Sequence, residues 1–133
     1  MAILDRLPTT DRLQRMGLSV DGSCCLCADG QESRDHIFSA CPYSKLVWQA
    51  MLDHCGFHRA SLEWEAELAW LSANLRGKKM RVIVCKIFWC SFVYHIWEER
   101  NYRRFRDKKR DCNTLIHSIK ETVNIRIQSI GHL

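Results

Sequence analysis

Apolar residues recur along most of this chain at the three- and four-residue spacing of an α-helix. Strand-like alternation of apolar and polar residues is weak throughout the sequence. Six Gly and two Pro in 133 residues are few for an all-β fold, which needs frequent turns. The pattern therefore predicts an all-α fold, a small domain of about five to six helices.

Residues suited to cap a helix N-terminus, and glycines that end helices, predict four longer helices from residue 42 onward. Ser61 is placed to cap the second of them. The first part of the third helix has apolar residues on nearly all of its faces, as a central core helix does. Its last part is polar and should lie at the surface. The predicted ranges are about 42–55, 62–75, 79–106 and 114–130. Their tryptophans are expected in the core rather than on a stacking surface: Trp64, Trp70, Trp89 and Trp97.

Two shorter helical pieces are predicted nearer the N-terminus. The first follows Thr9 or Thr10 and ends at Gly17, which suits a left-handed C-terminal cap. The second has Ser33 as its N-cap and ends at Cys41, because the following proline disfavours helical geometry in the residue before it. The stretch between the two pieces is rich in turn-forming residue types.

The length of the chain predicts a single domain, residues 1–133. Within it we distinguish two parts. An N-terminal region over 7–56 carries the cysteine cluster described below. A helical C-terminal region over 57–133 carries a basic stretch, residues 100–110.

Charged residues and a proline interrupt the apolar residues at the start of the chain, so we expect no secretory signal and an intracellular location. The most apolar segment, residues 80–97, contains Arg81, Lys86 and His95. Charges in the middle of such a run argue against a membrane span, and we expect no membrane partner. In an intracellular protein, eight cysteines indicate reduced thiols or metal ligands more than a disulfide framework.

Cys24 and Cys27 are separated by two residues, the spacing at which a tight turn directs both sulfurs at one ion. Cys25 is separated from Cys27 by one residue only, which suits that geometry less well. His36 follows after eight residues and Cys41 after four more, giving the pattern C-x2-C-x8-H-x4-C. Three Cys and one His are a common ligand set of structural zinc.

With four protein ligands no coordination position is open, so the predicted cofactor is one structural Zn²⁺. Its expected task is to fix the loop 23–32 against the helix that begins at Pro42. A His on a helical turn and a Cys just past its end can converge, whereas positions five apart on one α-helix diverge by about 140°. Buried free thiols and a redox pair remain the alternatives.

These residues resemble the zinc-binding region that follows the reverse transcriptase in plant non-LTR (LINE-type) retrotransposons. That family typically shows a Cys-x-x-Cys pair, an acidic-Ser/Thr pair, His-Leu-Phe, Cys-Pro and a Trp soon after. The matching residues here are Cys24, Cys27, Glu32-Ser33, His36-Ile37-Phe38, Cys41-Pro42 and Trp48. The upstream run LPTTDRLQRMGL and the downstream run IWEERNYRRF resemble flanking elements of the family, so the resemblance covers about residues 7–105.

The resemblance implies a zinc-binding region, here over residues 7–56, with a role in nucleic-acid binding. The polymerase domain and the part of the region upstream of Leu7 have no counterpart here, so we expect a terminal fragment or a short separate gene. Cys25 stands where the family usually has another residue type. We therefore expect Cys25 to be replaceable without loss of the metal.

Positive charge is concentrated in one part of the chain. Residues 78–110 hold eleven Lys/Arg and three Asp/Glu, a net charge of +8 in a chain whose total is +5. Such a segment can neutralise phosphates, and Tyr102 and Phe105 within it can stack on unpaired bases. The predicted nucleic-acid contacts are Arg100, Arg103, Arg104, Arg106, Lys108, Lys109 and Arg110.

The alternative is a solvated helix end, partly compensated by a pair between Glu99 and Arg103, which are four residues apart. The same run can also act as a nuclear import signal, so we predict a nuclear location.

The sequence shows no paired catalytic carboxylates, no Gly-rich phosphate loop and no nucleophile–base set. We therefore expect no enzyme and no small-molecule substrate. The first hypothesis is an accessory module that binds RNA or DNA. The second is a protein-interaction or structural remnant of a retrotransposon protein that binds no nucleic acid.

Overall fold

The computed structural model describes residues 7–131, and residues 1–6, where no secretory signal is expected, lie outside the described part. The described residues form helices and no strand, which confirms the predicted all-α fold. The elements are α1 (Thr10–Arg15), the π-helical turn η2 (His36–Ala40), α2 (Pro42–His54), α3 (Trp64–Asn74), α4 (Met80–Phe105) and α5 (Cys112–Gly131).

The four longer helices agree with the predicted ranges to within two residues at each end. The predicted cap Ser61 is wrong, because α3 begins later, after an extended Glu63 that makes no side-chain cap. The backbone N–H groups of Ser61 and Leu62 donate to other side chains instead, to Gln49 Oε1 at 2.9 Å and to Glu67 Oε1 at 2.8 Å. These hydrogen bonds hold the chain extended before the helix starts.

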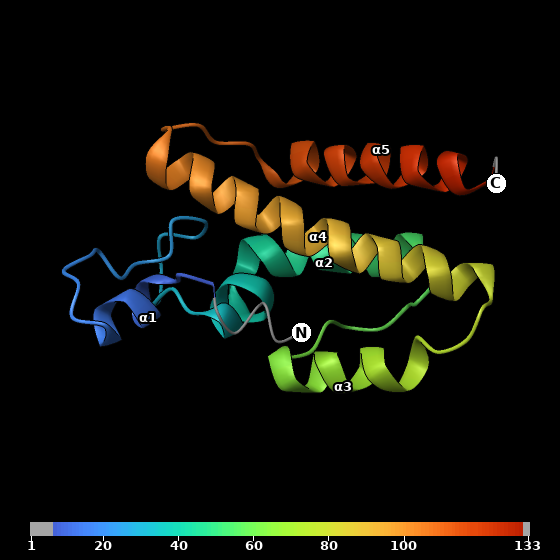
Figure 1. Cartoon of the computed structure of the whole chain (residues 1–133), viewed down its shortest axis with the longest axis horizontal. Coiled ribbons are helices and arrows are strands. Elements are labelled where there is room, and N and C mark those ends of the chain that lie inside the picture. The colour runs from blue at the N-terminus through green and yellow to red at the C-terminus, as the bar shows by residue number, and fades with distance from the viewer. Residues whose placement is uncertain (1–6, 132–133) are drawn as a thin grey trace.

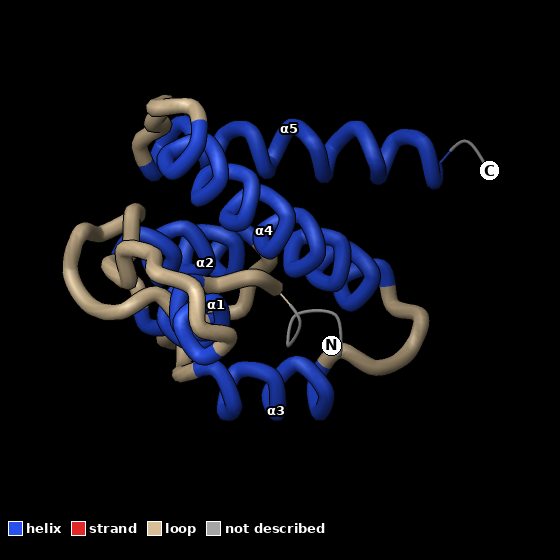
Figure 2. The backbone as a smooth tube through the Cα atoms, turned by 60° about the vertical axis from the view of Figure 1, so that its left-hand side comes forward, coloured by secondary structure: helices blue, strands red, loops and turns tan. Residues whose placement is uncertain are grey.

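The long helix α4 crosses the middle of the molecule (Figure 1). It contacts both α2 and α5, which also contact each other. The second view keeps α5 and α3 on opposite sides of α4, with the turn-rich N-terminal segment at one end of the bundle (Figure 2). The site described below lies where this segment meets the bundle.

By length and composition, α4 is a candidate for a membrane-spanning helix. A buried core helix meets the same criterion, and in this structure Phe88, Phe92 and Ile96 on α4 are almost completely buried. Leu115 and Ile119 on α5 are fully buried in the same core cluster. Packing between helices therefore covers much of the apolar surface of α4.

Tryptophan rings pack α2 and α3 against α4. Trp48 of α2 packs edge-on against Trp89 of α4, with ring centroids 5.0 Å apart, and Trp64 lies 6.0 Å from Trp89. All three are buried, which confirms the prediction for Trp64 and Trp89. Trp70 and Trp97, also predicted in the core, are only partly buried at its edge.

Candidate metal centre

The four predicted ligands lie together. The ligand atoms of Cys24, Cys27, His36 and Cys41 are all within 4.8 Å of one another. Cys24 Sγ is 3.9 Å from Cys41 Sγ, and Cys27 Sγ is 3.3 Å from His36 Nε2. A tetrahedral zinc with bonds of about 2.3 Å to sulfur and about 2.0 Å to nitrogen requires ligand separations of about 3.5–3.8 Å. The separations in the group therefore fit one zinc ion.

A tight turn positions the first two ligands. The N–H of Ala28 donates to the carbonyl of Cys24 at 2.8 Å, and the N–H of Cys24 donates to the carbonyl of Gly30 at 3.0 Å. An antiparallel bridge between Ser23 and Gln31 closes the base of the turn. Cys24 and Cys27 thus reach the metal position from one short loop, as their spacing predicts.

Gly30 is required at its position for two reasons. Its φ of +84° is in the left-handed region that L side chains rarely adopt. A Cβ on this residue would also lie 3.2 Å from Cε1 of His36. The absence of a side chain at Gly30 therefore leaves room for the ligand imidazole.

A π-helical turn brings the other two ligands together. The N–H of Cys41 donates to the carbonyl of His36 at 2.7 Å, an i→i+5 hydrogen bond. This bond makes residues five apart neighbours, whereas an ordinary α-helix would separate them. Ser33 caps the start, since its Oγ accepts from the N–H of His36 at 3.1 Å. The turn ends at an extended Cys41, as predicted, but its π-helical form was not anticipated.

The buried sulfurs of Cys24 and Cys41 share a hydrogen bond and differ in acidity. That bond lowers the pKa of Cys24 to about 5 against the opposing effect of burial. The same bond, together with burial, raises the pKa of Cys41. The pair therefore favours one thiolate even before a metal is bound, and the thiolate is the form that coordinates zinc.

Residues 1–48 match the model of a family described as zinc-binding in reverse transcriptase. This N-terminal part of the chain is similar to that family. The matched residues include all four members of the Cys3His group, so family and geometry agree on one structural zinc. No curated protein and no solved structure matches the chain.

Within the zinc-binding loop, residues 23–32, Cys25 lies outside the Cys3His group. Its Sγ is 3.6 Å from the backbone carbonyl of Arg100, at the C-terminal part of α4. Burial raises its pKa, which keeps the side chain a neutral thiol. Cys25 therefore packs the loop against α4 and is not arranged as a ligand.

The loop ends in a buried carboxylate, Glu32, that joins three parts of the chain. Its Oε1 accepts from the N–H of Thr10 at 2.9 Å and from Nη2 of Arg100 at 2.9 Å. Its Oε2 accepts from Nε of Arg100 at 3.0 Å and from Nη2 of Arg104 at 3.2 Å. Glu32 is fully buried and Arg100 is 2% exposed, so this is a buried bidentate ion pair.

A second fully buried carboxylate, Glu99, holds the end of α4. Arg103 Nε and Arg110 Nε both donate to it at 2.7 Å. Burial opposes its ionisation, but these hydrogen bonds hold the pKa of Glu99 below its usual value. Arg103 also donates to the carbonyls of Cys25 and Leu26 at 3.2 and 3.1 Å. The guanidinium therefore ties the zinc-binding loop to α4.

The predicted nucleic-acid contacts consequently divide into two groups. Four arginines have carboxylate partners and are buried or partly buried: Arg100, Arg103, Arg104 and Arg110. Arg106, Lys108 and Lys109 are exposed, and no ion pair is recorded for them within residues 7–131. Of these pairs, the sequence predicts only that of Glu99 with Arg103. The pairing of Glu32 with Arg100 was not predicted, although both residues belong to the motifs that carry the resemblance.

Proposed function

We propose that this protein is a zinc-stabilised accessory module that binds RNA or DNA and catalyses no reaction. Its N-terminal part is similar to the zinc-binding regions of reverse transcriptases, which supports a role beside nucleic acid. The observation that carries the proposal is the exposure of Arg106, Lys108 and Lys109 within four residues at the end of α4. Closely spaced exposed cations of this kind release counterions when they meet phosphates.

The turn that presents these cations is fixed by the fold. The N–H of Lys108 donates to the carbonyl of Tyr102 at 3.2 Å, which folds the chain back on α4. The carbonyl of Arg110 accepts from the hydroxyl of Tyr43 at 2.8 Å and from Arg103 at 2.9 Å. Binding therefore requires little ordering of the backbone, which favours affinity.

The zinc acts in this proposal through the fold and does not contact the nucleic acid. It closes the loop whose carbonyls and whose Glu32 hold Arg100 and Arg103 in place. Those arginines belong to the last turns of α4, from which the exposed cations follow. Loss of the metal should therefore weaken nucleic-acid binding indirectly, by loosening the end of α4.

Binding of single- and double-stranded DNA and RNA, measured by fluorescence anisotropy at several salt concentrations, tests the proposal. Each phosphate contact contributes about 0.7–0.9 to the slope of log K against log salt, so three cations predict a slope of about −2 to −3. The triple variant R106A/K108A/K109A should abolish most of this slope. The matched control K78A/K79A/K86A removes three exposed lysines near the other end of α4 and should leave the slope unchanged.

Absence of binding by the zinc-loaded protein at low salt would refute the proposal. Equal slopes for the two triple variants would show that the end of α4 is not the contact surface. Zinc content of the same samples, expected near one ion per chain, ensures that every variant is compared in its folded form.

The second candidate is a protein-interaction or structural module that binds no nucleic acid. It is favoured by the inward pairing of four of the seven predicted cationic contacts, which leaves less free positive charge than the sequence suggests. The low-salt binding measurement separates the two candidates.

We further propose a nuclear location and an origin in a LINE-type retrotransposon. Exposure of Arg106, Lys108 and Lys109 supports the first, since an import receptor reads accessible cations. A fluorescent fusion that stays equally distributed with or without R106A/K108A/K109A would contradict it.

A further inference from the structure

Two large aromatic side chains on α4 remain exposed. Tyr94 is 63% and Phe105 is 72% exposed, and neither belongs to the core formed by the described residues. Trp97 lies between them and is partly buried. Steps of three and eight residues bring all three onto one face of the helix, which spans about 16 Å at 1.5 Å per residue. Packing within the bundle does not explain these exposed rings.

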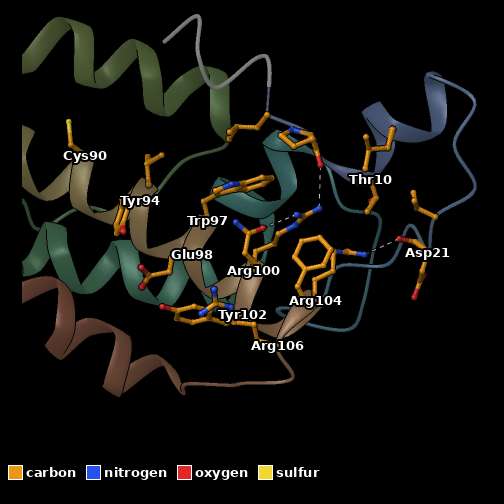
Figure 3. A pocket seen from close by; sticks show the side chains of 17 residues that line it. Thr10, Asp21, Cys90, Tyr94, Trp97, Glu98, Arg100, Tyr102, Arg104 and Arg106 are labelled. Carbon is orange, nitrogen blue, oxygen red and sulfur yellow. Dashed lines mark hydrogen bonds between the residues drawn. The ribbon is translucent and has the colours of Figure 1, made fainter.

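This face of α4 forms one wall of a groove of about 1070 Å³. The opposite wall comes from the N-terminal segment and includes Leu13, Val20 and Asp21. Figure 3 shows Tyr94 and Trp97 along the helix and Thr10 and Asp21 across from them. The groove is thus long, largely apolar and bordered by aromatic rings.

One end of the groove is cationic. Arg104 and Arg106 line it, and the exposed Lys108 and Lys109 follow directly in the chain. Two acidic side chains also line the groove, Asp21 and Glu98, but Glu98 is paired with Arg110 at 3.1 Å. Aromatic faces beside a cationic end suit a ligand with flat rings on an anionic backbone.

We propose that this groove binds unpaired bases of a single-stranded nucleic acid, stacked on Tyr94, Trp97 and Phe105. Aromatic faces accept any base, and the adjoining cations hold the phosphates. The bases of a duplex are already stacked and paired, so a duplex can use the cations but not the rings. The inference rests on the proposed function and adds to it the class of nucleic acid and the surface that selects it.

The zinc-binding loop shapes this groove. Arg100 lies under Trp97, with its Cζ 4.5 Å from the ring centroid, and is held by the buried Glu32. Arg104 donates to the backbone carbonyl of Asp21 at 3.4 Å (Figure 3). It also donates to the carbonyl of Ser23 at 3.2 Å, and these bonds join the two walls. The spacing of the walls therefore depends on the loop that the metal closes.

The test compares zinc-loaded variants binding to single-stranded oligonucleotides of about 12 nucleotides and to the matching duplex. Y94A/F105A removes two stacking rings and should bind a single strand more weakly by about 30-fold or more, with duplex affinity and salt slope unchanged. Y94L/F105L should lose as much, because it keeps apolar area but no flat ring. Y94F/F105Y keeps both rings and should retain wild-type affinity. I125A removes an apolar side chain that is 68% exposed on α5, outside the groove, and should change nothing.

Three results would overturn the inference. If Y94A/F105A binds single strands normally while R106A/K108A/K109A does not, the groove proposal fails and the proposed function stands. If the wild type binds neither single strands nor duplex, both fail. If the protein sediments as a dimer that Y94A/F105A dissociates and Y94L/F105L preserves, a second copy of the chain covers the groove.

Discussion

Residues around the Cys3His group differ in how strongly their replacement should affect zinc binding. His36 and Cys41 are neighbours only because a π-helical hydrogen bond of 2.7 Å joins their backbones. Gly30 makes room for the imidazole, whereas the thiol of Cys25 lies outside the Cys3His group, 3.6 Å from the backbone carbonyl of Arg100. Metal affinity should therefore be sensitive to some positions in the loop and insensitive to others close by.

Replacing Cys25 by Ser should leave about one zinc per chain, whereas replacing Cys41 by Ser should remove most of it. The hydroxyl in the first variant can still donate toward the carbonyl of Arg100, while the second loses one of four ligands. Metal analysis after dialysis gives both values. Full metal in Cys41→Ser would contradict the ligand set.

Gly30→Ala should lower zinc affinity and destabilise the protein by about 1–2 kcal/mol from backbone strain alone. The new methyl group would crowd His36, which must then move away from the metal. Gly77→Ala is the control, because Gly77 has a similar φ of +95° with no atom within 4 Å of the added Cβ. It should show the strain in its free energy of unfolding and bind zinc normally. Equal zinc affinities for the two variants would contradict the role of Gly30.

At the next scale, separate elements are held together by buried polar groups. Glu32 joins α1, the zinc-binding loop and α4, and Glu99 joins α4 to the turn before α5. In a third case the buried Glu67 of α3 accepts from Trp48 of α2 and pairs with Arg59. These buried carboxylates fix how the elements pack. If the elements packed differently, each carboxylate and its cationic partner would be buried without a counter-charge.

Glu32→Gln should destabilise the protein by about 3–5 kcal/mol, since it leaves Arg100 buried without a compensating charge. Chemical denaturation of the zinc-loaded protein measures the change. Glu121→Gln is the control, because Glu121 pairs with His117 on the surface of α5, where both side chains are mostly exposed. Glu121→Gln should change the free energy of unfolding by close to zero. A small effect of Glu32→Gln would mean that Arg100 finds water or another acceptor.

For the molecule as a whole, the zinc-binding loop and the helical bundle have different sources of stability. The bundle buries apolar side chains between α2, α4 and α5, including Val47, Phe92 and Leu115. Of the loop, only Cys24 and Leu26 belong to the buried hydrophobic core. The loop therefore depends on the metal and on the arginines of α4.

Removing zinc with a chelator should loosen part of the molecule and leave the rest folded. Hydrogen exchange of backbone amides should speed up in residues 22–41 and at the end of α4, where Arg103 binds loop carbonyls. The amides of α5 around Ile119 should stay protected, because that helix packs in the apolar core. Uniform loss of protection would show instead that the whole fold depends on the metal.

The sequence by itself determined the helical class, the helix ranges to within two residues and the four members of the Cys3His group. These features are local. Apolar spacing, caps and ligand spacing are determined by neighbours along the chain, so they can be predicted without knowing how the elements pack.

The tertiary structure alone decided which charges are free. Arg100 and Arg106 are both cations in the same basic stretch of the sequence, yet one is buried against Glu32 and the other exposed. The carboxylate that pairs with Arg100 lies 68 residues away in the chain, and only the packing of the zinc-binding loop on α4 brings the two together. The same packing leaves Tyr94 and Phe105 exposed along a groove. Contacts between distant segments depend on the complete fold, and local patterns contain no information about them.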